Sequence, residues 1–140
     1  MARFGGKMIH YLTLKSRERT ELIDITSQVE ELIAASRVAA GVCDVFVLHT
    51  TAAVTVNEGA DPAVKRDIAN CLDRMVPNAH YFTHAEGNSA AHVKASLIGA
   101  SQRLLLDRGK LLLGTWQSLY FCEFDGPRER RVAVSICKAD

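Results

Sequence analysis

The apolar and polar positions along the chain change period several times, and each change marks a predicted element. Residues 7–15 alternate loosely between apolar and polar side chains, and residues 20–25 do so again after a turn at 16–18. Alternation with a period of two is typical of strands, so this region predicts a β-hairpin. A near-continuous apolar run over 42–48 predicts a central strand that is covered on both faces, and 52–56 follows as a second extended stretch.

Three segments carry apolar residues at helical spacing. Ser27 to Glu30 fits a capping box at the start of a first helix, and Gly41 marks its end or the turn beyond it. Asp61 and Pro62 predict the N-cap and the first position of a second helix, which a proline ends at position 77. The alanine-rich residues 89–98 predict a shorter third helix before a glycine.

The last third of the chain is strand-like. Residues 102–106 and 110–113 flank Asp107-Arg108-Gly109, which has the chemistry of a hairpin turn. Residues 119–124 alternate in strand fashion, and 131–137 return the chain after a second turn. Strands at both ends with helices between them favour an α+β fold, and we expect one domain over the whole chain because we find no repeat or linker.

Composition and charge narrow the classes of protein. Of 140 residues, 48% are hydrophobic and 24% charged, which is typical of a globular domain and argues against disorder. A net charge of +1 gives no signature for nucleic acid or an anionic membrane, and we interpret the basic cluster of Arg128, Arg130 and Arg131 as a solvated turn. No apolar run reaches the ~18 residues of a membrane helix and the N-terminus has no signal core, so we expect a cytoplasmic protein.

The four cysteines are widely spaced, never form a C-x-x-C pair and lie among apolar neighbours. This pattern predicts reduced, mostly buried thiols in a reducing compartment, although a shared metal or disulfide role stays open.

Three histidines lie beside other polar residues at the ends of predicted elements. His49 directly follows the predicted central strand, and His84 and His92 bracket Glu86-Gly87-Asn88 at the start of the third helix. Neutral imidazole is the commonest protein ligand for zinc and similar ions, so these three side chains are candidate metal ligands. Each can equally be a hydrogen-bonded structural residue, which is our interpretation of His10 and His80.

Two carboxylates lack a simple structural explanation. Glu123 lies in an apolar strand, where an ionised side chain needs a partner such as a metal cation, a histidine or Arg128. Strand alternation can equally point Glu123 into solvent. Glu58 stands close to Asp61, and capping explains Asp61 but not Glu58, which is therefore a candidate site residue.

The residues before the third helix also suggest an anion site. Gly87-Asn88-Ser89, with Lys94 further along, can bind an anionic group through free backbone amides and the helix dipole. Many helix starts with this composition bind nothing.

Six motifs in order along the chain together resemble one family. They are His49-Thr50-Thr51-Ala52-Ala53, Asn57-Glu58-x-Ala60-Asp61-Pro62, His84-x-Glu86-Gly87-Asn88, Ala91-His92-x-Lys94-Ala95-Ser96-Leu97, Gly114-Thr115-Trp116-Gln117 and Phe121-x-Glu123-Phe124-Asp125-Gly126-Pro127-Arg128. They resemble the small bacterial and archaeal proteins of the YjbQ family, also labelled secondary thiamine-phosphate synthase. The resemblance covers residues 7–137.

The resemblance implies a two-sheet β-sandwich with flanking helices that forms a trimer about a threefold axis. It also implies a site close to a subunit boundary, lined by His49, His84, His92 and Glu123. Thr50 enters the candidate site as the neighbour of His49. Further positions match the family motifs and are expected to contact the substrate: Asn57, Glu58, Asn88, Lys94, Trp116, Gln117 and Arg128.

Three functions follow from these residues. The resemblance implies a transferase that joins a pyrimidine diphosphate to a thiazole phosphate with loss of pyrophosphate, which Lys94, Arg128 and a divalent ion neutralise. Its expected catalytic residues are His49, Glu123 and His84. Its expected metal ligands, His49, His84 and His92, favour zinc or a similar ion over Mg²⁺. The alternatives are a metal-dependent hydrolase of a small phosphorylated or amide substrate and a non-catalytic trimer that binds a metabolite.

Overall fold

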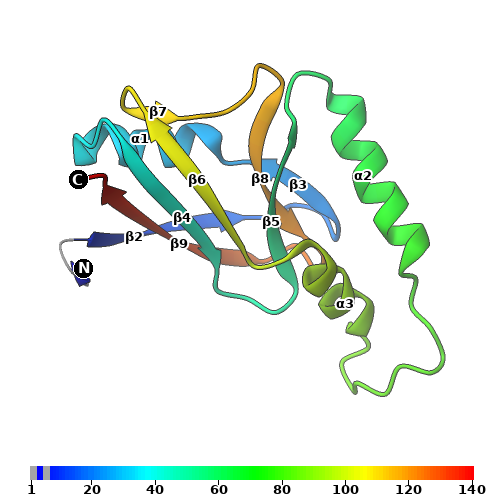
Figure 1. The fold of residues 1–140 in the computed structure, drawn as a ribbon. Coiled ribbons are helices and arrows are strands. Elements are labelled where there is room, and N and C mark those ends of the chain that lie inside the picture. The colour runs from blue at the N-terminus through cyan, green and yellow to red at the C-terminus, as the bar shows by residue number, and fades with distance from the viewer. Residues whose placement is uncertain (1–2, 5–6) are drawn as a thin grey trace.

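The computed structural model describes residues 3–4 and 7–140 of the chain. Figure 1 shows α2 and α3 on one side of the molecule and α1 on the other. The helices are α1 (Thr26–Ser36), α2 (Pro62–Met75) and α3 (Ser89–Ile98). The strands are β1 (Arg3–Phe4), β2 (Lys7–Lys15), β3 (Glu21–Asp24), β4 (Gly41–Val47), β5 (Ala52–Glu58), β6 (Ser101–Asp107), β7 (Lys110–Leu111), β8 (Gln117–Glu123) and β9 (Glu129–Lys138).

The strands form two antiparallel sheets. A large sheet has the order β1-β2-β9-β4-β6-β7, and a small sheet has the order β3-β8-β5. The predicted α+β sandwich with flanking helices is therefore confirmed. The predicted hairpin between β6 and β7 is confirmed as well, since Asp107 pairs with Lys110 across the turn.

The small sheet is the middle layer of the fold. One of its faces joins the large sheet and α1 in a core that includes Phe121, Val134 and Ile33. Its other face joins α2 and α3 in a second cluster that includes Tyr120 and Leu72. Residues 119–123 of β8 are consequently all buried. Burial of apolar side chains on both faces is the main force that holds these layers together.

Two predictions about strands were wrong. The run over 42–48 forms β4, but only its inward face, with Val45 and Val47, is buried, whereas Phe46 on the outward face is 49% exposed. β8 is covered on both faces instead, since its residues 119–123 are all buried. The N-terminal hairpin was also wrong, because β2 pairs with β9 in the large sheet while β3 pairs with β8 in the small sheet. The turn between β2 and β3 therefore carries the chain from one layer to the other.

The first helix also differs from its prediction. It begins at Thr26 after Ile25, whose side chain cannot cap, so the predicted capping box is wrong. The hydroxyl of Thr26 instead accepts a hydrogen bond from the backbone N–H of Leu119 in β8. The helix ends at Ser36, and Gly41 opens β4, where a Cβ would meet the backbone of Cys137.

The other two helices agree with their predictions. The Asp61 side chain caps α2 by accepting from the backbone N–H of Ala63, and Gly99 directly follows the last residue of α3. None of the helices in the described part of the chain is long and apolar enough to cross a membrane.

The cysteines divide into two groups. Cys43 and Cys122 are buried, and desolvation raises the pKa of both thiols to about 12, so they stay protonated. Cys137 is half-buried, and Cys71 is exposed on α2 because it lies on the face of the helix turned from the second core. All four thiols are free, as predicted, but burial is limited to two of them.

Candidate functional site

The antiparallel pairings bring polar residues from distant parts of the chain to one end of the sandwich. Val47 pairs with Val132, so the end of β4 lies beside the beginning of β9. Ala52 pairs with Glu123, so the start of β5 lies beside the end of β8. The connection over 48–51 therefore lies close to the turn between β8 and β9.

A cavity of about 470 Å³ opens at this end. His49, His84 and His92 all line it, together with Asn88 and residues of the turn after β8. A neighbouring hollow of about 460 Å³ shares His84 and His92 and has an aromatic wall that includes Tyr81. The structure thus brings together the three histidines that the sequence analysis singled out.

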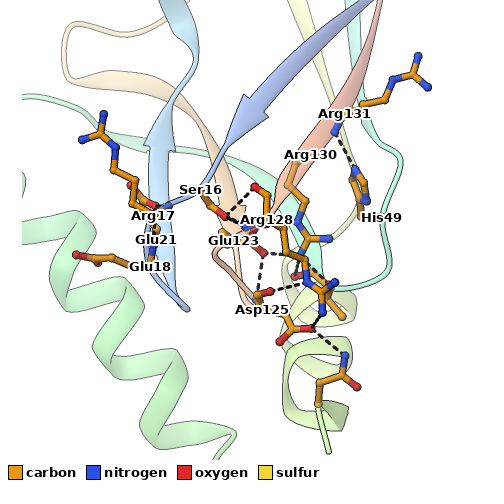
Figure 2. A network of polar contacts seen from close by, with 12 residues as sticks. Ser16, Arg17, Glu18, Glu21, His49, Glu123, Asp125, Arg128, Arg130 and Arg131 are labelled. Atoms are coloured by element: carbon orange, nitrogen blue, oxygen red, sulfur yellow. Dashed lines mark hydrogen bonds and ion pairs between the residues drawn. The ribbon is translucent and has the colours of Figure 1, made fainter. Parts of the chain in front are cut away.

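His49 is held in one tautomer by the backbone. Its Nε2 accepts a hydrogen bond from the backbone N–H of Arg131 at 2.8 Å, so the ring proton of the neutral imidazole is on Nδ1 (Figure 2). Burial lowers the pKa of His49, and the Arg130 guanidinium lowers it further. His49 is therefore neutral at pH 7, and its Nδ1–H is the ring donor left for a ligand.

His84 and His92 form a pair in the same cavity. Their ring centroids are 5.4 Å apart in an edge-to-face arrangement, and His84 Nε2 lies 4.0 Å from Glu86 Oε1. Among residues 3–4 and 7–140, no three His, Cys, Asp or Glu side chains are placed to hold a metal ion together. Since Nε2 of His49 is occupied by a backbone donor, a metal site made of all three histidines does not fit this geometry.

Glu123 is a buried partner of Arg130 rather than a lining residue of the cavity. It is 0% exposed, and Figure 2 shows its carboxylate among Ser16, Arg130 and Asp125. Oε1 accepts from the Ser16 hydroxyl at 2.6 Å and from Arg130 Nε at 2.8 Å. Oε2 accepts from the Asp125 backbone N–H at 3.1 Å and from Arg130 Nη2.

These hydrogen bonds determine the charge of Glu123. Burial by itself raises the pKa of this carboxyl, but the donors from Arg130, Ser16 and the Asp125 backbone outweigh burial and hold the pKa below its ordinary value. Glu123 is therefore ionised at neutral pH. Its partner is Arg130, whereas the sequence analysis named Arg128 among the candidates.

Arg130 and Asp125 line this site but are not among the residues that the sequence predicts for it. The cluster of Arg128, Arg130 and Arg131 predicts a solvated turn, but this prediction is wrong for Arg130, which is 3% exposed. It occupies an inward position of β9 in alternation with the buried residues Val132 and Val134. That alternation is visible in the sequence, and extending it two residues toward the N-terminus would have placed Arg130 inside.

A second polar group borders the cavity. Asp125 Oδ2 accepts from Asn88 Nδ2 at 2.9 Å and from Arg128 Nη2 at 2.9 Å, while Arg128 Nε donates to the Asp125 carbonyl. Burial raises the pKa of Asp125, but the bonds from Asn88 and Arg128 outweigh it and lower the pKa overall. Asn88 and Arg128 thus lie in the cavity, and Asn88 Oδ1 is buried there without a partner among the described residues.

Five expected substrate contacts lie elsewhere. β5 and β8 pair along their whole length, with Ala52 opposite Glu123 at the end near the cavity and Glu58 opposite Gln117 at the far end. Six residues of extended strand separate these two ends by about 20 Å. Lys94 is buried against Asp73 of α2 and borders a separate small hollow. Within one chain, the histidine cavity is therefore not completed by Asn57, Glu58, Lys94, Trp116 or Gln117.

Comparison with known proteins identifies the relatives of this chain. The family described as UPF0047 protein YjbQ-like matches residues 10–139. UPF0047 protein MJ1081 of Methanocaldococcus jannaschii is 49% identical over 130 residues, which cover 93% of this chain and 94% of that protein. UPF0047 protein YugU of Bacillus subtilis is 47% identical, with 92% and 98% covered.

Solved structures agree with this relationship. A YjbQ/UPF0047 protein of Clostridium acetobutylicum has a TM-score of 0.89 at 49% identity, with 91% of this chain and 99% of that chain covered. A YbjQ-like protein of unknown function from Sulfolobus solfataricus also has a TM-score of 0.89, at 32% identity, with 95% and 98% covered. The chain belongs to the UPF0047 protein YjbQ-like family.

Proposed function

We propose that the histidine cavity binds small phosphorylated metabolites and that the chain joins a pyrimidine diphosphate to a thiazole phosphate with release of pyrophosphate. The observation that carries this proposal is the neutral, tautomer-fixed His49 in a cavity that also holds guanidinium groups. Donors arranged in this way stabilise negative charge that develops on a leaving group. The family resemblance supplies the particular pair of substrates.

The transfer balances without an added co-reactant. The thiazole nitrogen forms a bond to the methylene carbon of the pyrimidine, and the bond from that carbon to the diphosphate oxygen breaks. Pyrophosphate leaves with the electron pair, and the thiazole nitrogen becomes a cation, so no proton needs to be removed from it. In this scheme Nδ1–H of His49 and the guanidinium of Arg128 donate to the departing oxygens. His84, which also lines the cavity, protonates the released pyrophosphate in this scheme.

We expect purified protein to form thiamine phosphate when both substrates are supplied, and to form at least about 100-fold less when His49 is replaced by alanine. Product is measured by chromatography of the oxidised, fluorescent thiochrome derivative. Wild-type protein that yields no more product than His49→Ala would overturn the proposed transferase.

A divalent metal stays a prediction. The pair of His84 and His92, with Glu86 nearby, is the part of the site that can still supply ligands. Mass spectrometry of metal content in tag-free wild type and His84→Ala tests it. Stoichiometric metal that is lost in the variant would support a metal at this pair, and metal absent from both would remove it from the proposal.

We also propose that the predicted homotrimer forms through the outward face of the large sheet. Tyr11, Phe46 and Leu105 are 47%, 49% and 56% exposed on this face. Tyr11 and Phe46 lie in one row across β2, β9 and β4, because both pair with Ala133. Leu48, which lines the cavity, is exposed as well, so the cavity lies close to this apolar surface.

We expect light scattering to give three times the chain mass for the wild type and a lower mass for Phe46→Asp, because a buried unpaired carboxylate opposes association. Met75→Asp serves as the control, since Met75 is exposed at the end of α2, which packs on the small sheet and not on the large sheet. Phe46→Asp that keeps the wild-type mass would exclude this face as the interface.

A further inference from the structure

We propose that Arg130 is the anchor for an oxyanion group of the ligand in the histidine cavity. The inference rests on the proposed function in one respect: the proposed function identifies the oxyanion group of the ligand as a phosphoryl group, which presents a pair of oxygens. The guanidinium is buried inside the protein, is oriented by neighbouring side chains and borders the cavity.

The hydrogen bonds of Arg130 use only one side of its guanidinium. A guanidinium carries five N–H donors. Nε donates to Glu123 Oε1, and Nη2 donates to Glu123 Oε2 and to the Thr51 hydroxyl at 2.8 Å. In the described part of the chain, Nη1 has no hydrogen-bond partner. The two N–H donors of Nη1 are therefore left for a ligand, and a ligand in the cavity can reach Arg130 because Arg130 lines it.

Glu123 and Thr51 hold these donors in place before a ligand arrives. The Thr51 side chain and both charged groups are almost fully buried, and each carboxylate oxygen of Glu123 receives two hydrogen bonds. A donor fixed in advance binds an anion without losing side-chain freedom. Glu123 thus acts through Arg130 as a positioning residue.

The remaining donors of the cavity support the same class of ligand. Arg128 is held by Asp125 on one side, and His49 offers its Nδ1–H. The charges of Arg128 and Arg130 are balanced by Asp125 and Glu123, so recognition depends on directed hydrogen bonds rather than on net charge. Planar guanidinium donors match the paired oxygens of phosphate or carboxylate groups.

The test measures binding by isothermal titration calorimetry with pyrophosphate, orthophosphate and malonate at constant ionic strength. Arg130→Lys keeps a positive charge for Glu123 but lacks the Nη1 group that would donate to a ligand in the cavity. We expect it to weaken pyrophosphate binding by about 10- to 100-fold. Arg74→Lys is the control, because Arg74 is exposed near the end of α2 and does not line the cavity. It should bind pyrophosphate within about twofold of wild type.

Each outcome decides the inference. Arg130→Lys that binds pyrophosphate as tightly as wild type would overturn it, and so would a wild type that binds none of the three anions. If Arg130→Lys does not fold by circular dichroism, Thr51→Val replaces it, with an expected loss of about fivefold, and an unchanged affinity there would overturn the anchor. If the wild type binds malonate but neither phosphate anion, and Arg130→Lys loses this binding, the anchor would be supported and a phosphorylated ligand contradicted. If the wild type binds the phosphate anions through Arg130 but forms no thiamine phosphate, the anchor would be supported and only the proposed transferase contradicted.

Discussion

Replacing Glu123 with alanine is expected to lower the free energy of unfolding by about 3–5 kcal/mol, as measured by urea denaturation. The change leaves the Arg130 guanidinium buried without its counter-charge. It also leaves the Ser16 hydroxyl and the Asp125 backbone N–H without their acceptor. Removing one partner of a buried pair costs far more than the pair contributes, because the remaining charge cannot return to water.

The exposed ion pair of Asp44 and Arg103 provides the control. Asp44→Ala should cost less than about 1 kcal/mol, because solvent screens both charges. Glu123→Ala that is no less stable than Asp44→Ala would contradict the buried pair. Glu123→Leu combined with Arg130→Met should recover much of the lost stability, since two apolar side chains leave no buried charge.

The same pair predicts how stability depends on pH. The folded-state pKa of Glu123 is lowered, so its stabilising contribution is fully present above the unfolded-state pKa of about 4.5 and is lost as pH falls through the folded-state value. Asp125 acts in the same direction, because its pKa is lowered as well. Wild type should therefore lose more stability than Glu123→Ala when the pH is brought below 4.5.

The elements of the fold were more predictable than their pairing. Asp61 and Pro62 determine the start of α2 through local capping, and the turn at Asp107 to Gly109 determines a short hairpin. Neither signal depends on distant residues. The pairing of β2 with β9 joins segments more than 100 residues apart, and no local pattern specifies it. A hairpin with β3 was for that reason the natural but wrong expectation.

The site could be predicted in part for a similar reason. His49, His84 and Asn88 attract attention because polar residues stand at the ends of apolar elements. Arg130 escaped notice because it lies between other arginines, which suggest a solvated turn. Glu58 lies at the far end of β5, so the order of motifs along the chain did not indicate which of them meet in space.

The second large effect concerns His49, for which two amide substitutions separate the roles of its nitrogens. Gln can still place an oxygen near Nε2, and so keep the acceptor for the Arg131 N–H, but it lacks the Nδ1–H donor. We expect His49→Gln to fold with wild-type stability and to lose about 100- to 1000-fold in kcat/KM for thiamine phosphate formation.

His49→Asn makes the opposite exchange, because its amide N–H lies close to the position of Nδ1 while the acceptor for Arg131 is lost. It should therefore retain more activity than His49→Gln. The opposite ranking would mean that His49 acts through Nε2 and that its hydrogen bond to Arg131 is broken during the reaction.

Because burial and then Arg130 lower the pKa of His49, activity that depends on its neutral form should persist below the ordinary value of 6.5. A pH profile that falls at 6.5 or above in wild type but not in His49→Asn would contradict a neutral donor at this position.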